Sequence, residues 1–418
     1  MGKALLVSSS AGTTSASGDF TNLYGHNTDS VTESDTQASC TEAATFSGFG
    51  ARIISGNSGT ATFRFRDAGA NGNQTFQITG TGSNEDATNT DILAAGDLFN
   101  VNYSDTGTNS TLSWRKANVE FSSGHGNFHG AAAFNGNVHD VQSTTRFIAL
   151  SGGLGLDGIV TENNAEYLIR SYDSFEALQV RVKANARLNT STFRNRINSG
   201  NGTALVEFAT LVTGLVSDTG VGDAITDGQT VNASITLGVG LEDLTVSFVC
   251  ATLKSSTSKS ETWSANQGGI ARTASATAHY VPIGGYIVDL TTIGSDVNAR
   301  IKPGFAAVVS NLRCYLSANT YSGNGTLKLY QNGSAVLTTI ITASGGAGWY
   351  ENTSDTITID ADDELSFEFD EGTSGSITIH SAGITFAPVS EVTQAFMMFP
   401  PRTDGLGRGG IFPGNRVL

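Results

Sequence analysis

The sequence predicts an all-β protein: three tandem antiparallel β-sandwich domains, each jelly-roll-like, followed by an extended C-terminal arm. Three observations support this fold class. Polar positions carry Thr, Ser and Asn instead of the helix formers Glu, Lys and Gln. Apolar and polar residues alternate along many short segments, and one pattern returns about every 130 residues. A chain of 418 residues with 39% hydrophobic content is also long enough for several separate cores.

The alternating segments indicate strands with one buried and one wet face, as in an antiparallel sandwich. Examples lie at 62–66, 327–330 and 356–359, and turn signals such as Asn332-Gly333 separate the segments. Roughly eight strands in each repeat favour two packed sheets, hence a jelly roll. Helical periodicity is absent apart from one short helical turn that the sequence allows within 162–170.

The repeat is clearest in the second and third copies. The strand at 178–182 aligns with the strand at 312–316, and an Ala-Asn step follows each. Segments beginning at residues 146 and 279 also match, as do the turns at 227–228 and 362–363. These landmarks lie 133 to 135 residues apart. Only turn and core residues recur in this alignment, which favours a spacer and packing role for each copy.

The first copy is looser. Residues 49–69 carry the same strand and turn, residues 95–98 occupy the later turn, and the first strand begins near residue 3. We expect an insertion near 18–40 to lengthen this copy. The predicted domains are therefore 1–140, 141–275 and 276–390, with the arm at 391–418.

The C-terminal arm breaks the pattern, because Pro and Gly prevent a regular element there. Its apolar side chains suit an interface with a neighbouring subunit, and a free tail is the alternative. We expect the N-terminal strand to act as a second clamp. The predicted interface residues of the arm are Phe396, Met397, Met398, Phe399, Ile411 and Phe412.

No motif predicts catalysis, a cofactor or a metal. GxSxG and HExxH are absent, and 38 acidic residues make any single carboxylate pair uninformative. His125, His129 and His139 are close in sequence, but on Gly-rich chain they favour surface positions over a zinc site. The acidic run 360–364 is typical of a solvated turn. The three cysteines, Cys40, Cys250 and Cys314, are expected to be buried without disulfides.

Composition also limits the partners. A net charge of −15 without a Lys/Arg cluster excludes a nucleic-acid binder, and no apolar stretch approaches a membrane span. The N-terminus has too few apolar residues for a signal peptide, so we expect the chain to stay in a cytoplasm or leave by lysis. Trp114, Trp263 and Trp349 could stack on sugars, but packing at edges or interfaces is the stronger expectation.

Each copy is expected to contain the same sequence features in one order. A strand is followed by Ala-Asn, a turn, a second strand ending in Asn-Gly, a loop marked by Gly, and acidic residues that lead into another strand. Residues 312–369 show all of it; copy two lacks the Asn-Gly and copy one the Ala-Asn. This order resembles modules of structural proteins in tailed-bacteriophage particles, over about 300 of the 418 residues.

The resemblance implies a virion protein assembled in the host cytoplasm and bringing no catalytic residues. It would be an outer capsid decoration, cement or head-fibre protein that packs against the shell. The implied partners are the major capsid protein or tail proteins and further copies of the chain, often as a trimer. The alternative is a tail-associated fibre or spike that binds host-surface glycans.

Overall fold

The computed structural model describes residues 2–13, 18–21, 30–41, 43–55, 59–106, 111–123, 127–138, 145–150, 161–240, 243–257, 259–274, 278–281, 283, 285–286, 306–360, 363–370 and 372–389. Within this part of the chain, strands dominate and two short 3-10 helices complete the regular structure, η1 (Glu33–Asp35) and η2 (Glu162–Ala165). The prediction of an all-β protein is confirmed. The helical turn expected within 162–170 is η2.

The first unit is a sandwich of two sheets. One sheet has the order β1 (Gly2–Thr13), β9 (Thr111–Ser123), β4 (Ala44–Ser55) and β7 (Gly82–Leu93). The other has the order β2 (Asp19–Thr21), β8 (Leu98–Asp105), β5 (Thr60–Asp67) and β6 (Ala70–Thr79), with β3 (Ala38–Ser39) also paired to β8. All of these pairs are antiparallel.

The second unit repeats this order. One sheet runs β10 (Asn127–Val138), β18 (Leu244–Lys254), β13 (Ser174–Asn185) and β16 (Gly214–Ala224). The other runs β11 (Thr145–Ile148), β17 (Thr230–Thr236), β14 (Ser191–Ile197) and β15 (Gly200–Phe208), and β12 (Tyr167–Leu168) pairs with β17.

The third unit repeats it again. One sheet runs β21 (Gly285–Tyr286), β19 (Ser260–Thr273), β27 (Ser376–Pro388), β22 (Ala307–Asn319) and β25 (Gly348–Ile359). The other runs β20 (His279–Val281), β26 (Leu365–Asp370), β23 (Gly325–Gln331) and β24 (Ser334–Ile341). β21 is the exception to the antiparallel pattern, because it pairs with β19 in parallel.

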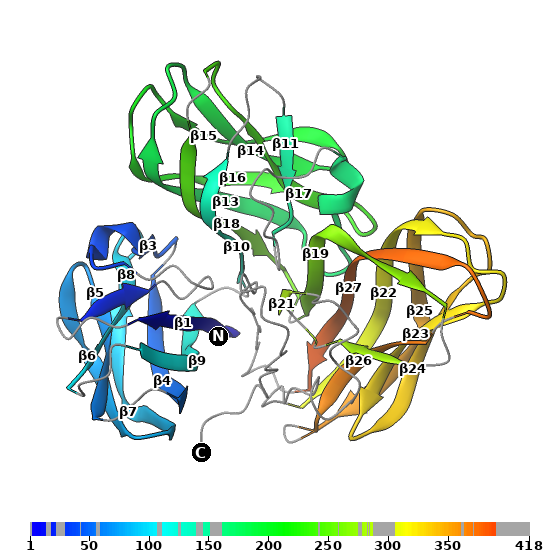
Figure 1. The fold of residues 1–418 in the computed structure, drawn as a ribbon, viewed down its shortest axis with the longest axis horizontal. Helices are drawn as coiled ribbons and strands as arrows, with labels where there is room; N and C mark the ends of the chain where they lie inside the picture. The colour runs from blue at the N-terminus through cyan, green and yellow to red at the C-terminus, as the bar shows by residue number, and fades with distance from the viewer. Residues whose placement is uncertain are drawn as a thin grey trace.

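In each unit the first strand lies beside the last, and the third main strand separates the last from the sixth. This connectivity is that of an eight-stranded jelly roll. Successive strands alternate between the two sheets except in the tight hairpins, so each sheet buries one face against the other. Figure 1 shows the three jelly rolls at the corners of a triangle, with domain 1 in blue, domain 2 in green and domain 3 in yellow to red.

The observed strand pairing favours domain boundaries that differ from those expected from the sequence. The expected first division, after residue 140, lies beyond β10, yet β10 pairs with β18 of the second unit. The second, after residue 275, lies beyond β19, yet β19 pairs with β27 of the third unit. We therefore propose units of 2–123, 127–254 and 260–388 in place of the expected boundaries, because a jelly roll needs its first strand to flank its last.

Residues 18–40 are not an insertion. They contain β2, η1 and β3, and the second unit has β11, η2 and β12 in the same order between its first and third main strands. The N-terminal strand is also not a free clamp, since β1 pairs along its length with β9 of its own unit. The C-terminal arm, 391–418, lies outside the described residues.

Two hydrophobic clusters form the cores. One joins domains 1 and 2 continuously and extends to Trp263, and the other fills domain 3. Cys40 and Cys250 are buried in the first cluster and Cys314 in the second, all as free thiols. The cysteine prediction is confirmed, and burial raises the pKa of the Cys250 and Cys314 thiols.

Aspartates protect the edge strand of the five-stranded sheet in domains 1 and 2. Asp86 and Asp91 on β7 accept the backbone N–H groups of Thr75 and Asn73 on β6, at 3.0 and 2.6 Å. In domain 2, β16 repeats the arrangement toward β15 through Asp218 and Asp223. An edge strand with its N–H groups already paired is a poor template for aggregation.

Asp86 provides a pH test. Burial alone would raise its pKa, but hydrogen bonds from Asn89, Thr75 and Thr88 outweigh it and hold the pKa at about 2. A depressed carboxyl pKa stabilises the fold above the unfolded value of about 3.9, and the stabilisation disappears as the pH falls through 2. In urea titrations between pH 7 and pH 2, Asp86→Asn should therefore lose about 1–3 kcal/mol at neutral pH and show a flatter acid limb. Glu207→Gln, which changes an exposed carboxylate on β15, is the control and should match the wild type.

Candidate functional site at the domain junctions

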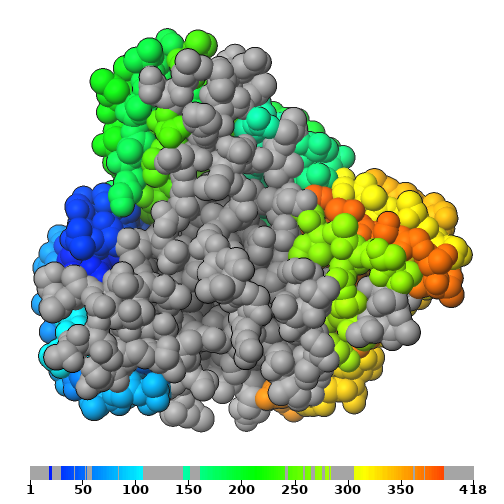
Figure 2. Space-filling view, in the orientation of Figure 1, coloured from blue at the N-terminus to red at the C-terminus, as the bar shows by residue number. Residues whose placement is uncertain are grey.

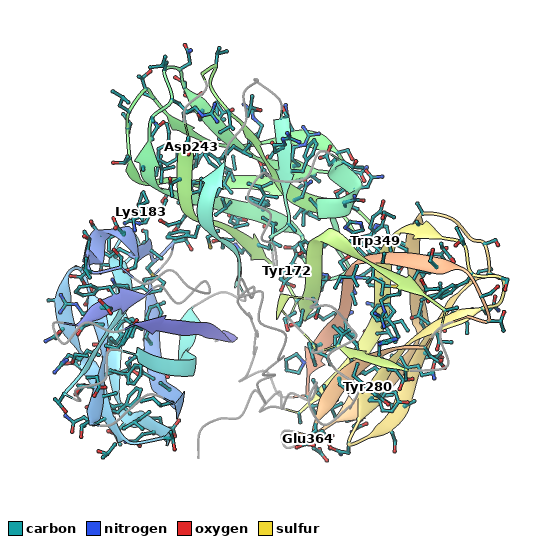
Figure 3. All side chains as sticks on the ribbon, viewed as in Figure 1. Tyr172, Lys183, Asp243, Tyr280, Trp349 and Glu364 are labelled. Carbon is teal, nitrogen blue, oxygen red and sulfur yellow. The ribbon has the colours of Figure 1, made fainter. Side chains whose placement is uncertain are left out.

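Domains 1 and 2 are joined by hydrogen bonds from β13 to the segment around β3. The Gln179 amide donates to the Ser39 carbonyl at 2.9 Å and accepts the Ser39 N–H at 3.4 Å. Arg181 Nε donates to the Gln37 carbonyl at 2.7 Å. Burial lowers the pKa of the Arg181 guanidinium to about 10, although nearby Asp35 acts the other way. At the rim, Lys183 lies 3.5 Å from Asp35, and Figure 3 shows Lys183 between the blue and green domains.

Domains 2 and 3 meet around a fully buried ion pair. Arg313 on β22 and Glu261 on β19 have no exposed side-chain surface, and the Arg313 guanidinium donates to a Glu261 carboxylate oxygen. Arg313 Nε also donates to the Leu168 carbonyl of domain 2 at 3.0 Å. The other Glu261 oxygen accepts the backbone N–H of Arg170, which also belongs to domain 2. Burial raises the pKa of Glu261, and Arg313 and the backbone donors oppose that effect.

Arg170 extends this network to the surface. Its guanidinium binds Glu351 of domain 3 through two donors and Asp227 of domain 2 through a third, at 2.9 Å. These partners raise the pKa of Arg170 above its ordinary value. The Tyr172 hydroxyl accepts the backbone N–H of Glu261 at 3.1 Å, which adds a third contact from domain 2 to this buried site.

Aromatic packing surrounds the ion pair. Trp263 of β19 is 2% exposed, and its ring lies 5.0 Å from Tyr167 and 6.2 Å from Tyr172 of domain 2. Tyr315 contacts Trp349 at 5.4 Å, on the domain 3 side. Figure 3 labels Tyr172 and Trp349 where the green and orange domains meet. Trp263 is therefore buried in an interface, as the packing interpretation expected, and offers no sugar platform. The Trp114 side chain lies outside the described residues.

The two junctions use equivalent positions of the repeat. Gln179 and Arg313 both lie two residues before a bulge in the third main strand, and each reaches the preceding domain. Their acceptors, the carbonyls of Ser39 and Leu168, both belong to the last residue of a two-residue strand that pairs with the seventh main strand. Domain 2 therefore contacts domain 1 through the same strand positions by which domain 3 contacts domain 2.

Polar residues do recur at matching positions, against the expectation that only turn and core residues would. Arg66 binds Glu33 through Nε and Nη2 and lies over the Phe20 ring at 5.7 Å. It also donates to Asn71 and to the carbonyl of Gly69.

Domain 2 contains the same set: Arg196 binds Glu162 and Asn201, donates to the Ser199 carbonyl and lies over Phe147 at 5.5 Å. In domain 3 the corresponding strands carry Tyr330 and Tyr280, whose rings form an edge-on pair at 5.7 Å. The arginine sets of domains 1 and 2 anchor the segment of η1 or η2 to the five-stranded sheet, so their role is structural.

The other predicted features fall in three places. The interface residues Phe396, Met397, Met398, Phe399, Ile411 and Phe412 lie outside the described residues, as do the side chains of the three clustered histidines. Asp363, in the acidic run, accepts the N–H of Asp360 and the amides of Gln331 and Asn332, as expected of a turn. Across the described residues, no group of His, Cys, Asp and Glu is placed to hold a metal ion. The same residues contain no helix with the length and hydropathy of a membrane span.

The solved structures compared with this chain are remote likenesses. No family model and no curated protein matches the chain. A protein described by the triple jelly-roll fold and turret assembly of an archaeal virus is 12% identical, with 86% of this chain and 83% of that one covered and a TM-score of 0.18. The infectious bursal disease virus Gx strain structure is 11% identical, over 65% and 74%, with a TM-score of 0.19. The Bacillus thuringiensis delta-endotoxin Cry8Ea1 is 10% identical, over 62% and 61%, with a TM-score of 0.18. Likenesses this weak have no bearing on function, so the chain is best defined by its own architecture of three jelly rolls joined by one repeated junction.

Proposed function

We propose that the chain is a structural component of a tailed-bacteriophage particle, and that it decorates or cements the outside of the capsid. The observation that carries this proposal is the repeated junction. It joins the three jelly rolls through buried polar contacts that repeat from one junction to the next, and jelly rolls are a common architecture of viral shell proteins. A decoration protein benefits from such junctions, because contacts made by one domain then help to hold the next domain in place.

The charge distribution supports an outer position. The chain carries a formal net charge of −15, which repels packaged nucleic acid and favours solubility at a solvent-facing surface. At both junctions, buried side chains hydrogen-bond to the preceding domain, which suits a protein that must hold its domains together within a particle. The proposed partners are the major capsid protein and further copies of the chain, with a trimer as the expected oligomer.

Particle labelling tests the function. A virus that encodes an epitope-tagged copy of the chain should give particles on which antibody-gold labels the head surface. Deleting the gene should leave assembled heads that lose DNA at a lower temperature or lower salt than the parent. Label on the tail, or tagged protein that stays unassembled beside unlabelled particles, would contradict the proposal.

A further inference from the structure

Three neighbouring loops at one end of domain 2 expose aliphatic side chains. Leu188 lies between β13 and β14, Leu211 and Val212 between β15 and β16, and Val239 between β17 and β18. Their exposed fractions are 63%, 65%, 44% and 62%. We call these four residues the domain 2 loop patch. Scattered single apolar residues are normal on a surface, but four at the same end of one sandwich form a candidate interaction site.

Hydrogen bonds between the loops hold the patch in place. Thr210 donates to the Leu188 carbonyl at 3.0 Å, and Asn189 donates to the Val239 carbonyl at 3.1 Å. Asn185 donates to the Val212 carbonyl at 2.9 Å. Beneath them the Arg187 guanidinium, 1% exposed, donates to the Gly240 carbonyl at 2.8 Å. The loops are therefore braced from inside, with the aliphatic side chains directed outward.

The backbone of the patch is also unusual. Leu211 has a φ of +60°, a left-handed conformation that bulky side chains rarely adopt. Gly or Asn would suit that position better, and such conformations concentrate at functional sites. Leu211 therefore combines an unfavourable backbone conformation with a side chain that lies mostly in water.

Domain 3 shows that the fold does not require the patch. Its Asn319 binds the Thr342 carbonyl as Asn185 binds the Ala209 carbonyl in domain 2. The corresponding loops nevertheless expose small polar residues instead of large aliphatic ones: Thr320, Ser322, Asn324, Thr342, Ser344, Thr373 and Ser374. Of these two described sets of loops, the set in domain 2 is therefore the one with apolar tips.

Charge and size indicate the kind of partner. Beside the loops, Glu207 is exposed and Asp243 partly exposed, whereas the nearby Lys183 is paired with Asp35. An acidic rim disfavours anionic lipid headgroups and complements a basic one. Four aliphatic side chains are also too few for a stable dimer, which buries about 800 Å² on each partner. Figure 3 labels Asp243 in domain 2, well away from Trp349 at the junction with domain 3, so that junction does not cover this region.

We propose that the domain 2 loop patch docks into an apolar, basic-rimmed depression on the capsid shell. This inference rests on the proposed function and specifies which surface of the chain carries it. The four aliphatic side chains of the patch would form the centre of the contact, which loses its water and where a few residues dominate affinity. Glu207 and Asp243 would form the polar rim around it.

Binding to purified shells that lack the chain tests the inference. The full-length variant Leu188→Ser, Leu211→Gly, Val212→Thr, Val239→Thr should bind at least about 100-fold more weakly than the wild type. The control Ile92→Thr, Ile340→Thr removes exposed aliphatic residues from strands of domains 1 and 3 and should bind as the wild type does. Circular dichroism should show all three proteins equally folded.

The outcomes separate the two proposals. If the wild type fails to bind shells at all, the proposed function is wrong. If the wild type binds and the loop variant binds equally well, the docking inference is wrong while the function stands. Flotation of the wild type with phosphatidylcholine vesicles, or a concentration-dependent dimer in sedimentation, would overturn the inference if the loop variant abolished it.

Discussion

The variant Glu261→Gln should lower the free energy of unfolding of domain 3 by about 3–5 kcal/mol, the cost of leaving a buried charge without its partner. Arg313 has no exposed side-chain surface, so its guanidinium cannot turn toward water when the carboxylate is lost. For a domain of this size the loss corresponds to a melting temperature roughly 10–20 °C lower. Differential scanning calorimetry of the full chain should show the domain 3 transition moving to lower temperature and separating from the others.

The matched control is the exposed ion pair of the other junction. Lys183 and Asp35 also join two domains, but their side chains are 45% and 24% exposed, so Asp35→Asn should cost less than about 1 kcal/mol. Equal effects of the two substitutions would show that burial of the Glu261 pair is not what holds domain 3.

The second large effect is expected in the core of domain 1. Phe65 is completely buried, and its ring lies 5.0 Å from Phe46 and 6.2 Å from both Phe49 and Phe99. Phe65→Ala should cost about 3–5 kcal/mol, since it removes the ring and leaves a cavity that these neighbours cannot fill. Urea unfolding followed by hydrogen exchange should locate the loss in β4, β5 and β8.

Domain 2 should respond to the same substitution, because one hydrophobic cluster spans both domains. Faster exchange is expected in β13 at the first junction, with domain 3 unchanged. Ile92→Ala, on the outside of β7 at 76% exposure, is the control and should stay within about 0.5 kcal/mol of the wild type. A Phe65→Ala cost below about 1 kcal/mol would contradict the proposed packing.

The strands could be predicted from sequence because their chemistry is local. Alternation marks β5, β23 and β25, and two of the landmark pairs used to align the copies fall on equivalent strands, β11 with β20 and β13 with β22. The Ala-Asn step has a physical role that the pattern alone did not reveal, since Asn185 and Asn319 each brace one loop against the next.

The domain divisions expected from the sequence differ from the proposed ones for an equally physical reason. The aligned landmarks begin at the second strand of each unit, and β10 is too rich in Gly and Ala to show clear alternation. Only residues 124–126 separate β9 from β10, so no change in composition marks the boundary. The supposed insertion at 18–40 was similarly misleading, because β3 is only two residues long.

The junctions could not be predicted from local pattern. Glu261 stands among Ser, Thr and Trp in a strand and resembles a surface position, while its partner Arg313 lies 52 residues away. The Arg66 and Arg196 sets become visible only once the segments of η1 and η2 are recognised as equivalent. Pairing across such distances depends on how whole sheets pack, which the sequence of a single strand does not contain.

The pairing of first and last strands sets the order in which the chain can fold during synthesis. β1 cannot complete its sheet until β9 has emerged, because Gly2 pairs with Ser123. β10 waits in the same way for β18, where Asn127 pairs with Lys254. Since each new domain reaches back to the short strand of the previous one, the finished domain presents a prepared surface to the next. Because synthesis proceeds from the N-terminus, the three sandwiches emerge from the ribosome in the same order in which each one packs against the one before it.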